Sequence, residues 1–402
     1  MSGSGLLDGV RVLDLTRFVS GAYASFTMAT LGAEVLKVES PTGGDPYRNQ
    51  GTARVGDESV LFMTLNSAKK SVALDFRAQS ARPAVEALLA SCDVFLENGR
   101  PGSLTKYRLD YESVHARHPH IVYGSISGFG DVGPDASKGG FDLILQASGG
   151  LMSVTGHEKT GPAKIGAPVT DVGAGLACVV GILAALVERE RSGVGRRVST
   201  SLLEFSMAAL ATLATAYLVN GELPGLLGSH SPTFAPYGAF RARDGMFVAA
   251  GAGSEALWQR FCQALGAPQL IEDPRFVDNH SRVSAREELT EEIEAFTTKR
   301  SVAEWIDIFE AAQVPADRIN DVPGVLGGAQ AQALGAVQTL HHETAGAYPV
   351  LGIPVRIDRH PLPIPHAAPR LGRHTREVLG SVGMASGDID TLIRSGTASE
   401  SP

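Results

Sequence analysis

Asp171 is the side chain of this 402-residue sequence whose surroundings most favour a chemical role. It lies in the segment GAPVTDVGAG (166–175), immediately before the longest apolar run of the chain, residues 172–187. An Asp at a helix start is most often only a cap, but a carboxylate on a rigid core helix can also serve as a nucleophile. We expect the helix amino end to lower the pKa of Asp171, and Gly173 and Gly175 to leave open space beside it.

A second group of candidates consists of polar and basic residues that follow predicted strands. Arg77 follows the strand at 71–74, and Asn98, Arg100 and Lys106 follow the strand at 93–96. In open parallel sheets, ligands lie beyond the carboxyl ends of the strands. Each basic residue alone is most simply a solvated surface charge. Together with Lys138, they predict a phosphate-binding cradle.

The elements that would position these residues alternate between short strands and helices. Strands are predicted at 10–15, 34–38, 71–74, 93–96, 120–125 and 197–201, and helices include 81–90 and 172–191. A later group comprises a strand at 246–250 and helices at 255–265, 287–298 and 303–312. We therefore predict an α/β protein with a Rossmann-like doubly wound large domain (1–222), a linker (223–236), a smaller α+β domain (237–321) and a C-terminal segment (322–402) that returns to the large domain.

The composition of the chain argues against several classes of protein. The chain is 44% hydrophobic and 19% charged, which argues against disorder, and its net charge of −8 argues against a nucleic-acid or anionic-membrane partner. The apolar run 172–187 is shorter than the ~20 residues of a membrane-spanning helix. The three cysteines lack CxxC spacing, and the first residues lack a secretory signal, so we expect a cytoplasmic protein.

Motifs of several enzyme classes are missing from the sequence. It contains no GxxxxGK[ST], GxSxG or HExxH motif, and its histidines show no metal-ligand spacing. The segment GAGSEA (251–256) resembles the start of a dinucleotide-binding motif, but no second strand ending in an acidic residue follows it. We therefore expect no metal, no nicotinamide or flavin site and no permanently bound cofactor.

A set of ordered segments covers nearly the whole chain: LDGVRVLDLT (7–16), LGAEVLKVE (31–39), NSAKKSVALD (66–75), ENGRPG (97–102), SISGFG (125–130), QASGGLM (146–152), GILAALVE (181–188) and PRLGRHT (369–375). In these segments the chain resembles the class III CoA-transferases, the CaiB/BaiF family. That family includes formyl-CoA transferase and also holds the α-methylacyl-CoA racemases.

The resemblance implies transfer of CoA from an acyl-CoA donor to a carboxylic acid acceptor, with the CoA thioester as substrate. The covalent intermediates, a mixed anhydride and an aspartyl-CoA thioester, would form on Asp171. The resemblance also implies an interlocked homodimer. The positions that match the family's CoA contacts are Val19, Ser20, Leu74, Arg77, Asn98, Gly99, Lys106 and Tyr107. Ser40, Lys106 and Gly139 differ from formyl-CoA transferase, so the exact phosphate contacts stay open.

Two alternatives remain beside the transferase. The racemases of the family use a His and an Asp on opposite sides of an α-carbon, and Phe141 stands at the position that matches the His. Phenylalanine cannot move a proton, which disfavours racemisation. A CoA-binding regulatory protein without turnover would share the fold motifs, but it would not need Asp171.

Overall fold

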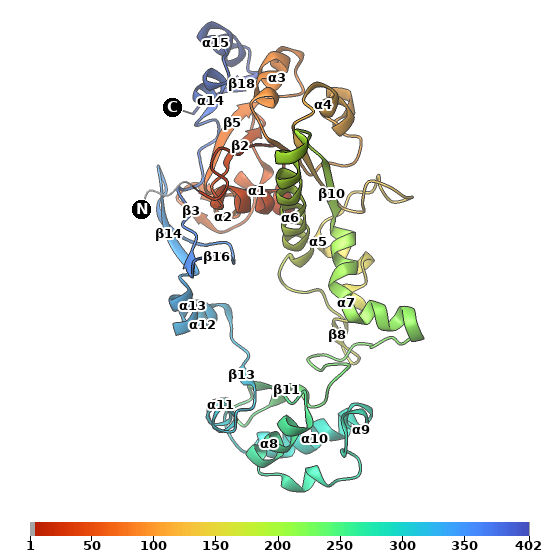
Figure 1. Ribbon diagram of the computed structural model, residues 1–402. Coiled ribbons are helices and arrows are strands. Elements are labelled where there is room, and N and C mark those ends of the chain that lie inside the picture. The colour runs from red at the N-terminus through yellow and green to blue at the C-terminus, as the bar shows by residue number, and fades with distance from the viewer. Residues whose placement is uncertain (1–4, 402) are drawn as a thin grey trace. The chain divides into compact units, whose positions relative to one another are not determined.

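The computed structural model describes residues 5–401 and divides into two compact units (Figure 1). The first unit takes in the chain up to Leu151, Ile165–Ala211 and the chain from Ala329 onward. The second unit takes in Met152–Lys164 and Thr212–Gly328. The candidate nucleophile and the candidate CoA-binding residues all belong to the first unit.

The first unit is built on a seven-stranded sheet in the order β10-β7-β6-β1-β2-β5-β18. All neighbours are parallel except β18, which is antiparallel to β5. Leaving out β18, this is the 3-2-1-4-5-6 order of doubly wound folds, with the order reversing between β1 and β6. Each predicted strand of this unit is present: β1 (Arg11–Asp14), β2 (Glu34–Glu39), β5 (Lys69–Leu74), β6 (Val94–Glu97), β7 (Val122–Ser127) and β10 (Arg197–Ser201), joined at the edge by β18 (Ala398–Ser399).

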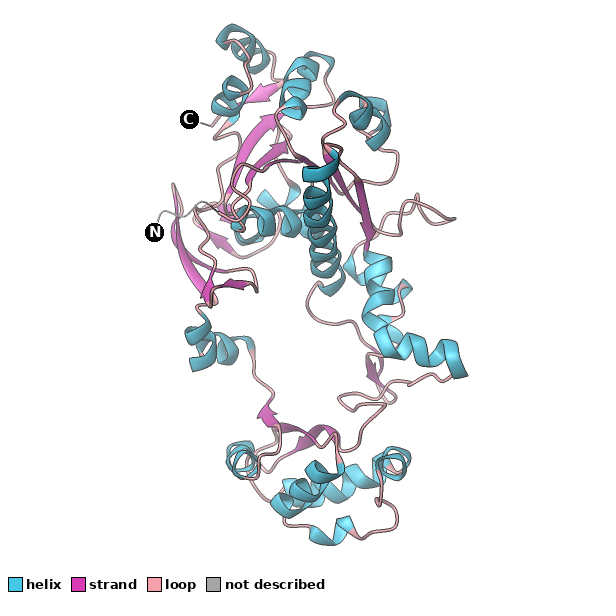
Figure 2. Ribbon diagram, in the orientation of Figure 1, coloured by secondary structure: helices cyan, strands magenta, loops and turns pink. Residues whose placement is uncertain are grey.

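Helices cover both faces of this sheet (Figure 2). Successive residues of a strand point to opposite faces, so Val12 packs in one apolar cluster and Leu13 in the other. The Val12 cluster receives side chains from α1 (Phe18–Thr30), α2 (Val60–Asn66) and α6 (Val169–Ser192). The Leu13 cluster receives side chains from α3 (Arg82–Ala90), α4 (Tyr111–Arg117), α14 (Thr375–Ser381) and α15 (Ser386–Arg394). The apolar strand sequences follow from this burial on both faces.

Shorter elements complete the first unit. Those that bear on the site are the 3₁₀ turn η1 (Pro46–Arg48) and the helix α5 (Asp142–Ser148). The C-terminal part adds a hairpin that packs on the Val12 cluster. The remaining elements are β3 (Arg54–Val55), β4 (Glu58–Ser59), η2 (Gln79–Ala81), η3 (Thr105–Tyr107), α13 (Ala329–Leu334), β14 (Val337–His342), β15 (Gly346–Leu351), β16 (Arg356–Ile357) and β17 (His360–Pro361). The 3₁₀ turn η4 (Leu151–Ser153) begins in the first unit and ends in the second.

By length and composition, α6 and α7 (Leu202–Asn220) could each cross a membrane. Helix α6, however, packs against α1 and β7, as expected of a helix in the core of a folded domain. Helix α7 is interrupted at Ala211, where φ is 43° and ψ is −115°. Several of its apolar side chains are exposed, among them Leu218 and Val219.

The second unit has its own core around a three-stranded antiparallel sheet. Its elements are β8 (Gly156–His157), β9 (Gly161–Pro162), β11 (Tyr237–Arg241), β12 (Phe247–Gly251), α8 (Glu255–Leu265), η5 (Pro268–Ile271), α9 (Asn279–Ser284), α10 (Arg286–Thr297), α11 (Val302–Ala311), β13 (Ala316–Arg318) and α12 (Val322–Gly327). The GAGSEA segment joins antiparallel β12 to α8. A dinucleotide motif belongs to a parallel βαβ unit, whereas this segment follows an antiparallel strand.

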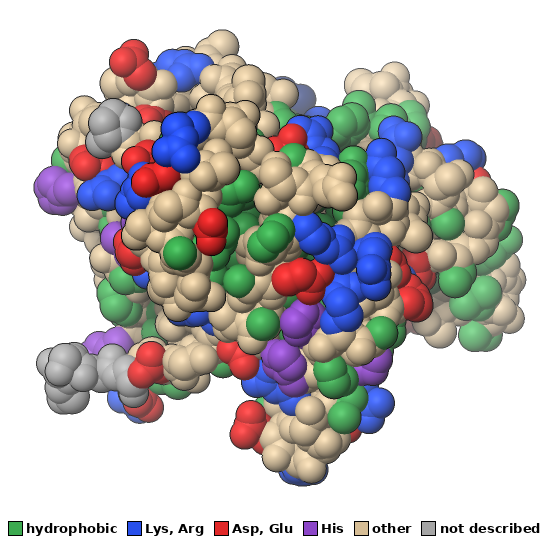
Figure 3. Space-filling model, turned by 90° about the horizontal axis from the view of Figure 1, so that it is seen from above, with side chains coloured by type: hydrophobic (Ala, Val, Ile, Leu, Met, Phe, Trp, Pro, Cys, Tyr) green, Lys and Arg blue, Asp and Glu red, His purple; other side chains and the backbone are tan. Residues whose placement is uncertain are grey.

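The surface mixes charges of both signs. In Figure 3, Lys and Arg side chains stand among Asp and Glu side chains across one face. Ion pairs such as Arg376 with Glu400 join charges that lie at the protein surface. Exposed pairs of this kind contribute little to stability, typically ~0–1 kcal/mol.

Candidate active site

Asp171 lies in the first turn of α6 but does not cap the helix. The cap position is Pro168, which makes no side-chain capping bond. Instead, Asp142 at the start of α5 accepts hydrogen bonds from the Thr170 backbone N–H (2.9 Å) and the Thr170 hydroxyl (2.7 Å). Gln146 donates to the other oxygen of Asp142 at 2.7 Å. The interpretation of Asp171 as a simple cap therefore does not hold.

Helix α1 approaches α6 closely beside Asp171. A Cβ at Gly175 would lie 2.6 Å from the carbonyl oxygen of Ser20, and a Cβ at Gly173 would lie 2.0 Å from the Phe205 ring. The expectation of open space beside Asp171 is therefore wrong. Because Gly175 and Gly173 have no side chains, α1 and the Phe205 ring pack against α6 at these two positions. The close approach brings the Ser20 side chain into a hydrogen bond with Asp171.

The pKa of Asp171 moves in the direction opposite to the one expected. Burial, and after it the negative charge of Asp142, raise the pKa of Asp171 to about 7. The hydrogen bond with Ser20 acts against both. The prediction of a lowered pKa is wrong. The effect of the helix amino end, which lowers the pKa, is smaller than the combined effect of burial and of the Asp142 carboxylate, which raise it. Near neutral pH, Asp171 exchanges between its protonated and ionised forms.

Three aromatic rings form a chain at this end of the first unit. The Phe18 ring makes T-shaped contacts with Tyr47, at 5.5 Å between centroids, and with Phe141, at 6.1 Å. Phe18 has a φ of 62°, a left-handed conformation that bulky residues rarely adopt. Such strained residues cluster at active sites, where the surrounding structure holds them. Phe141 directly precedes Asp142 and is 68% exposed.

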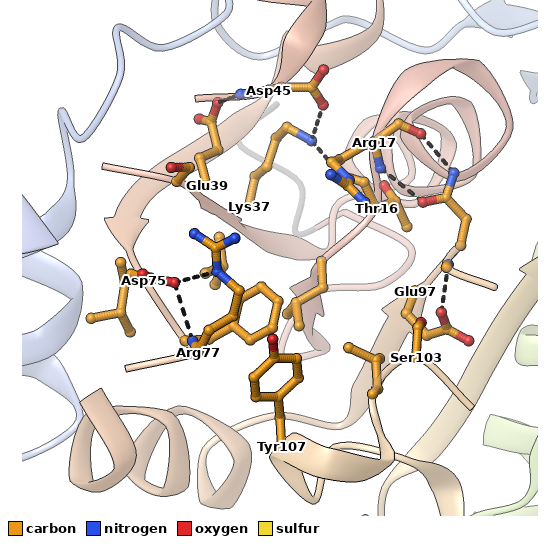
Figure 4. Close-up of a pocket in the computed structure, with 18 of the residues that line it drawn as sticks. Thr16, Arg17, Lys37, Glu39, Asp45, Asp75, Arg77, Glu97, Ser103 and Tyr107 are labelled. Atoms are coloured by element: carbon orange, nitrogen blue, oxygen red, sulfur yellow. Dashed lines mark hydrogen bonds and ion pairs between the residues drawn. The ribbon is translucent and has the colours of Figure 1, made fainter. Parts of the chain in front are cut away.

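A cavity of about 380 Å³ lies at the carboxyl ends of β1, β2, β5 and β6 (Figure 4). Asn98 joins two of its walls across the point where the strand order reverses. Its side-chain oxygen accepts from the Arg17 backbone N–H at 2.9 Å, and its amide donates to the Arg17 carbonyl at 2.6 Å. The candidate residues that line this cavity are Leu74, Arg77, Asn98, Gly99, Lys106 and Tyr107.

The charged side chains of this cavity are not equally available to a ligand. Lys37 is buried and pairs with Asp45 at 2.9 Å, and the exposed Arg77 pairs with Asp75 at 2.7 Å. The Lys106 ammonium lies 4.9 Å from the centroid of the Tyr107 ring. Within residues 5–401, Lys106 makes no ion pair, so its charge is free for a phosphate.

Arg100 and Lys138 line a second cavity of about 500 Å³ together with Phe129 and Gly139. Lys138 pairs there with Asp135 at 2.8 Å. The predicted basic cradle is thus divided between two cavities of the first unit.

Val19 and Ser20 line neither cavity but lie in the first turn of α1. The Asn98 amide lies 3.4 Å from the Ser20 hydroxyl, which also bonds Asp171. Ser20 therefore connects the wall of the first cavity to the candidate nucleophile.

Sequence reasoning missed Asp142 and Tyr47 as members of this site. Tyr47 lies close enough to Asp171 for the two ionisations to interact, since the charge of Asp171 contributes to the raised pKa of Tyr47. Asp142 directly follows Phe141 in the sequence, but its contact with Thr170 spans 28 residues and leaves no local pattern.

Comparison with known proteins agrees with the resemblance. The model of CoA-transferase family III matches residues 7–375. The chain is 37% identical over 391 residues to the succinyl-CoA:glutarate CoA-transferase of Mus musculus, covering 97% of this chain and 89% of the relative. It is 32% identical to the succinyl-CoA–D-citramalate CoA-transferase of Chloroflexus aurantiacus over 387 residues, 96% of each.

Solved structures give the same result. A CaiB/BaiF family protein from Brucella suis superposes with a TM-score of 0.82 at 33% identity, covering 94% of this chain and all of the other. A matching family model over most of the sequence, long relatives above 30% identity and a shared fold all agree. This chain therefore belongs to CoA-transferase family III and is a class III CoA-transferase.

Proposed function

We propose that the enzyme moves CoA between an acyl-CoA and a free carboxylic acid with Asp171 as the nucleophile. The observation that carries the proposal is that Asp171 does not cap α6 and lies beside Ser20. Asp142 accepts the hydrogen bonds from the first turn of the helix in its place. A pKa of about 7 leaves a substantial ionised fraction at neutral pH. An ionised carboxylate with little solvent around it is a suitable nucleophile.

The proposed reaction has four steps on this one side chain. An oxygen of Asp171 attacks the donor thioester, which gives a mixed anhydride and the CoA thiolate. The thiolate attacks the aspartyl carbonyl, which releases the donor acid and leaves an aspartyl-CoA thioester. The acceptor carboxylate attacks this thioester, and the released thiolate then attacks the acyl carbonyl of the new anhydride. These steps yield the new acyl-CoA and restore Asp171.

For substrates, we propose succinyl-CoA as donor and a dicarboxylic acid as acceptor. The mouse and Chloroflexus relatives are named for succinyl-CoA with glutarate and D-citramalate. A panel of acyl-CoA donors and free acids, with products measured by mass spectrometry, tests the proposal. Turnover with dicarboxylates supports it, and turnover confined to monocarboxylic acids contradicts the substrate class.

We place CoA along the first cavity, with Lys106 as a phosphate contact. Lys106→Ala is expected to raise the KM for acyl-CoA by about tenfold, the effect of losing a charged hydrogen bond. Arg77→Ala should have a smaller effect, because Asp75 already holds that guanidinium at 2.7 Å. Steady-state kinetics at saturating acceptor measures both. An unchanged KM in Lys106→Ala would place the CoA phosphates elsewhere.

The racemase alternative makes a separate prediction. With Phe141 and no His at that position, the enzyme is expected to exchange no α-proton of a 2-methylacyl-CoA. Incubation in deuterated water followed by mass spectrometry reads this directly. Enzyme-dependent label at the α-carbon that is lost in Asp171→Ala would favour racemisation. Label that appears only in Phe141→His would place residue 141 across the pocket from Asp171.

We also propose a homodimer, interlocked as the family resemblance implies. The exposed apolar side chains of α7, Met207, Tyr217, Leu218 and Val219, support the proposal, because a second chain would cover them. Sedimentation equilibrium of the purified protein measures the assembly, and a monomer at micromolar concentration would contradict it.

A further inference from the structure

Tyr47 occupies a backbone position that is fixed on both sides. Its N–H donates to the Asp45 carboxylate at 2.9 Å, and Asp45 is itself buried against Lys37. The next residue, Arg48, binds both oxygens of Glu39, at 2.7 and 2.8 Å. Two buried ion pairs thus hold the short turn that carries the Tyr47 side chain.

The ring of Tyr47 is directed toward the nucleophile's surroundings. It makes a T-shaped contact with the Phe18 ring, and two residues after Phe18 is Ser20, the hydrogen-bond partner of Asp171. Burial raises the pKa of Tyr47, and the charges of Asp171 and Asp45 raise it further. The phenol therefore keeps its proton at neutral pH and remains a hydrogen-bond donor.

The hydroxyl of Tyr47 differs from those of the buried tyrosines. The Tyr123 hydroxyl donates to the Leu109 carbonyl at 2.9 Å, and the Tyr348 hydroxyl lies 2.8 Å from the Ser67 hydroxyl. Within residues 5–401, the half-buried Tyr47 hydroxyl has no hydrogen-bond partner. A fixed donor without a partner beside a nucleophile is available to a ligand.

We propose that Tyr47 is a substrate-binding residue whose hydroxyl donates a hydrogen bond to the carboxylate of the free acid as it attacks, or leaves, the carbonyl of Asp171. The inference rests on the proposed function. In the acceptor step, a C–O bond forms between the acid and the aspartyl carbonyl, the C–S bond breaks, and CoA leaves as the thiolate. Tyr47 keeps its proton throughout and orients the attacking carboxylate.

The test compares Tyr47→Phe with Tyr111→Phe. The first variant removes the hydroxyl but keeps the ring that contacts Phe18. The second removes a hydroxyl from α4, where the ring stacks on His115 at 5.1 Å. Tyr47→Phe is expected to raise the KM for succinate and glutarate by about tenfold, with the KM for acyl-CoA within about twofold. Tyr111→Phe should change neither, and an unchanged acceptor KM in Tyr47→Phe would overturn the inference.

A binding measurement separates this inference from the proposed function. Succinate is titrated calorimetrically into the wild type and into Tyr47→Phe, each saturated with CoA. If the wild type transfers no CoA but Tyr47→Phe binds succinate about tenfold more weakly than the wild type does, the proposed function fails, whereas binding of the acid's carboxylate by Tyr47 stands. Equal binding of succinate by both proteins overturns the role of Tyr47, whatever the wild type catalyses.

Discussion

Asp171→Asn is expected to lower CoA transfer by at least ~10⁴-fold while leaving the fold intact, because the amide cannot form the anhydride. The measurement is formation of glutaryl-CoA from succinyl-CoA and glutarate, followed by mass spectrometry. Thermal unfolding of the same preparation, compared with the wild type, tests whether the variant is folded. Asp57→Asn is the matched control, because Asp57 is an exposed carboxylate in the turn between β3 and β4.

Covalent trapping tests the same assignment without a variant. Incubation of the wild type with acyl-CoA and then hydroxylamine should modify Asp171, because hydroxylamine captures activated aspartyl carbonyls. Peptide mapping locates the modified residue. Modification of Asp142 or of any other carboxylate in place of Asp171 would contradict the assignment.

The rate of transfer is expected to depend on pH through the ionisation of Asp171. Only the ionised form attacks, so kcat/KM should rise as pH increases through about 7. Asp142→Asn removes a negative charge next to Asp171 and should move this rise to lower pH. Ser20→Ala removes a hydrogen bond that favours the ionised form and should move the rise to higher pH.

These two variants serve as controls for each other, because their shifts have opposite signs. Each shift is expected to be about one pH unit, measured from kcat/KM between pH 5 and 9. In Asp142→Asn, the amide oxygen can still accept from Thr170, so the start of α6 is preserved. Profiles that coincide with the wild type in both variants would show that Asp171 does not control the rate.

Much of the large unit could be predicted from sequence because its strands are buried on both faces. A strand such as β1 must be apolar at consecutive positions, since Val12 and Leu13 enter opposite clusters. The edge strand β18 carried no such signal, because it has only two residues, Ala398 and Ser399. Its pairing with β5 is a tertiary contact rather than a local preference.

Part of the candidate site could also be predicted from the sequence, and part could not. Asp171 and the residues at the carboxyl ends of the strands could be identified, because chain position specifies them once the sheet order is known. The helix was predicted to begin at 172, whereas α6 begins at Val169, and the Asp142 side chain accepts a hydrogen bond from its first turn. The direction of the Asp171 pKa shift depends on that same contact and on burial, neither of which sequence spacing reveals.

The carboxylates at the start of α6 also set a limit on the stability of the fold. In the unfolded chain the pKa of Asp171 returns to its ordinary value of 3.8, whereas in the folded chain it is about 7. Between these pH values the folded state holds a proton that the unfolded state has released. The free energy of unfolding therefore falls as pH rises through this window, by at most about 1.4 kcal/mol per pH unit from this group. Asp171 thus makes the protein most resistant to unfolding in the protonated form that cannot react, and activity and stability have opposed pH dependences at a single side chain.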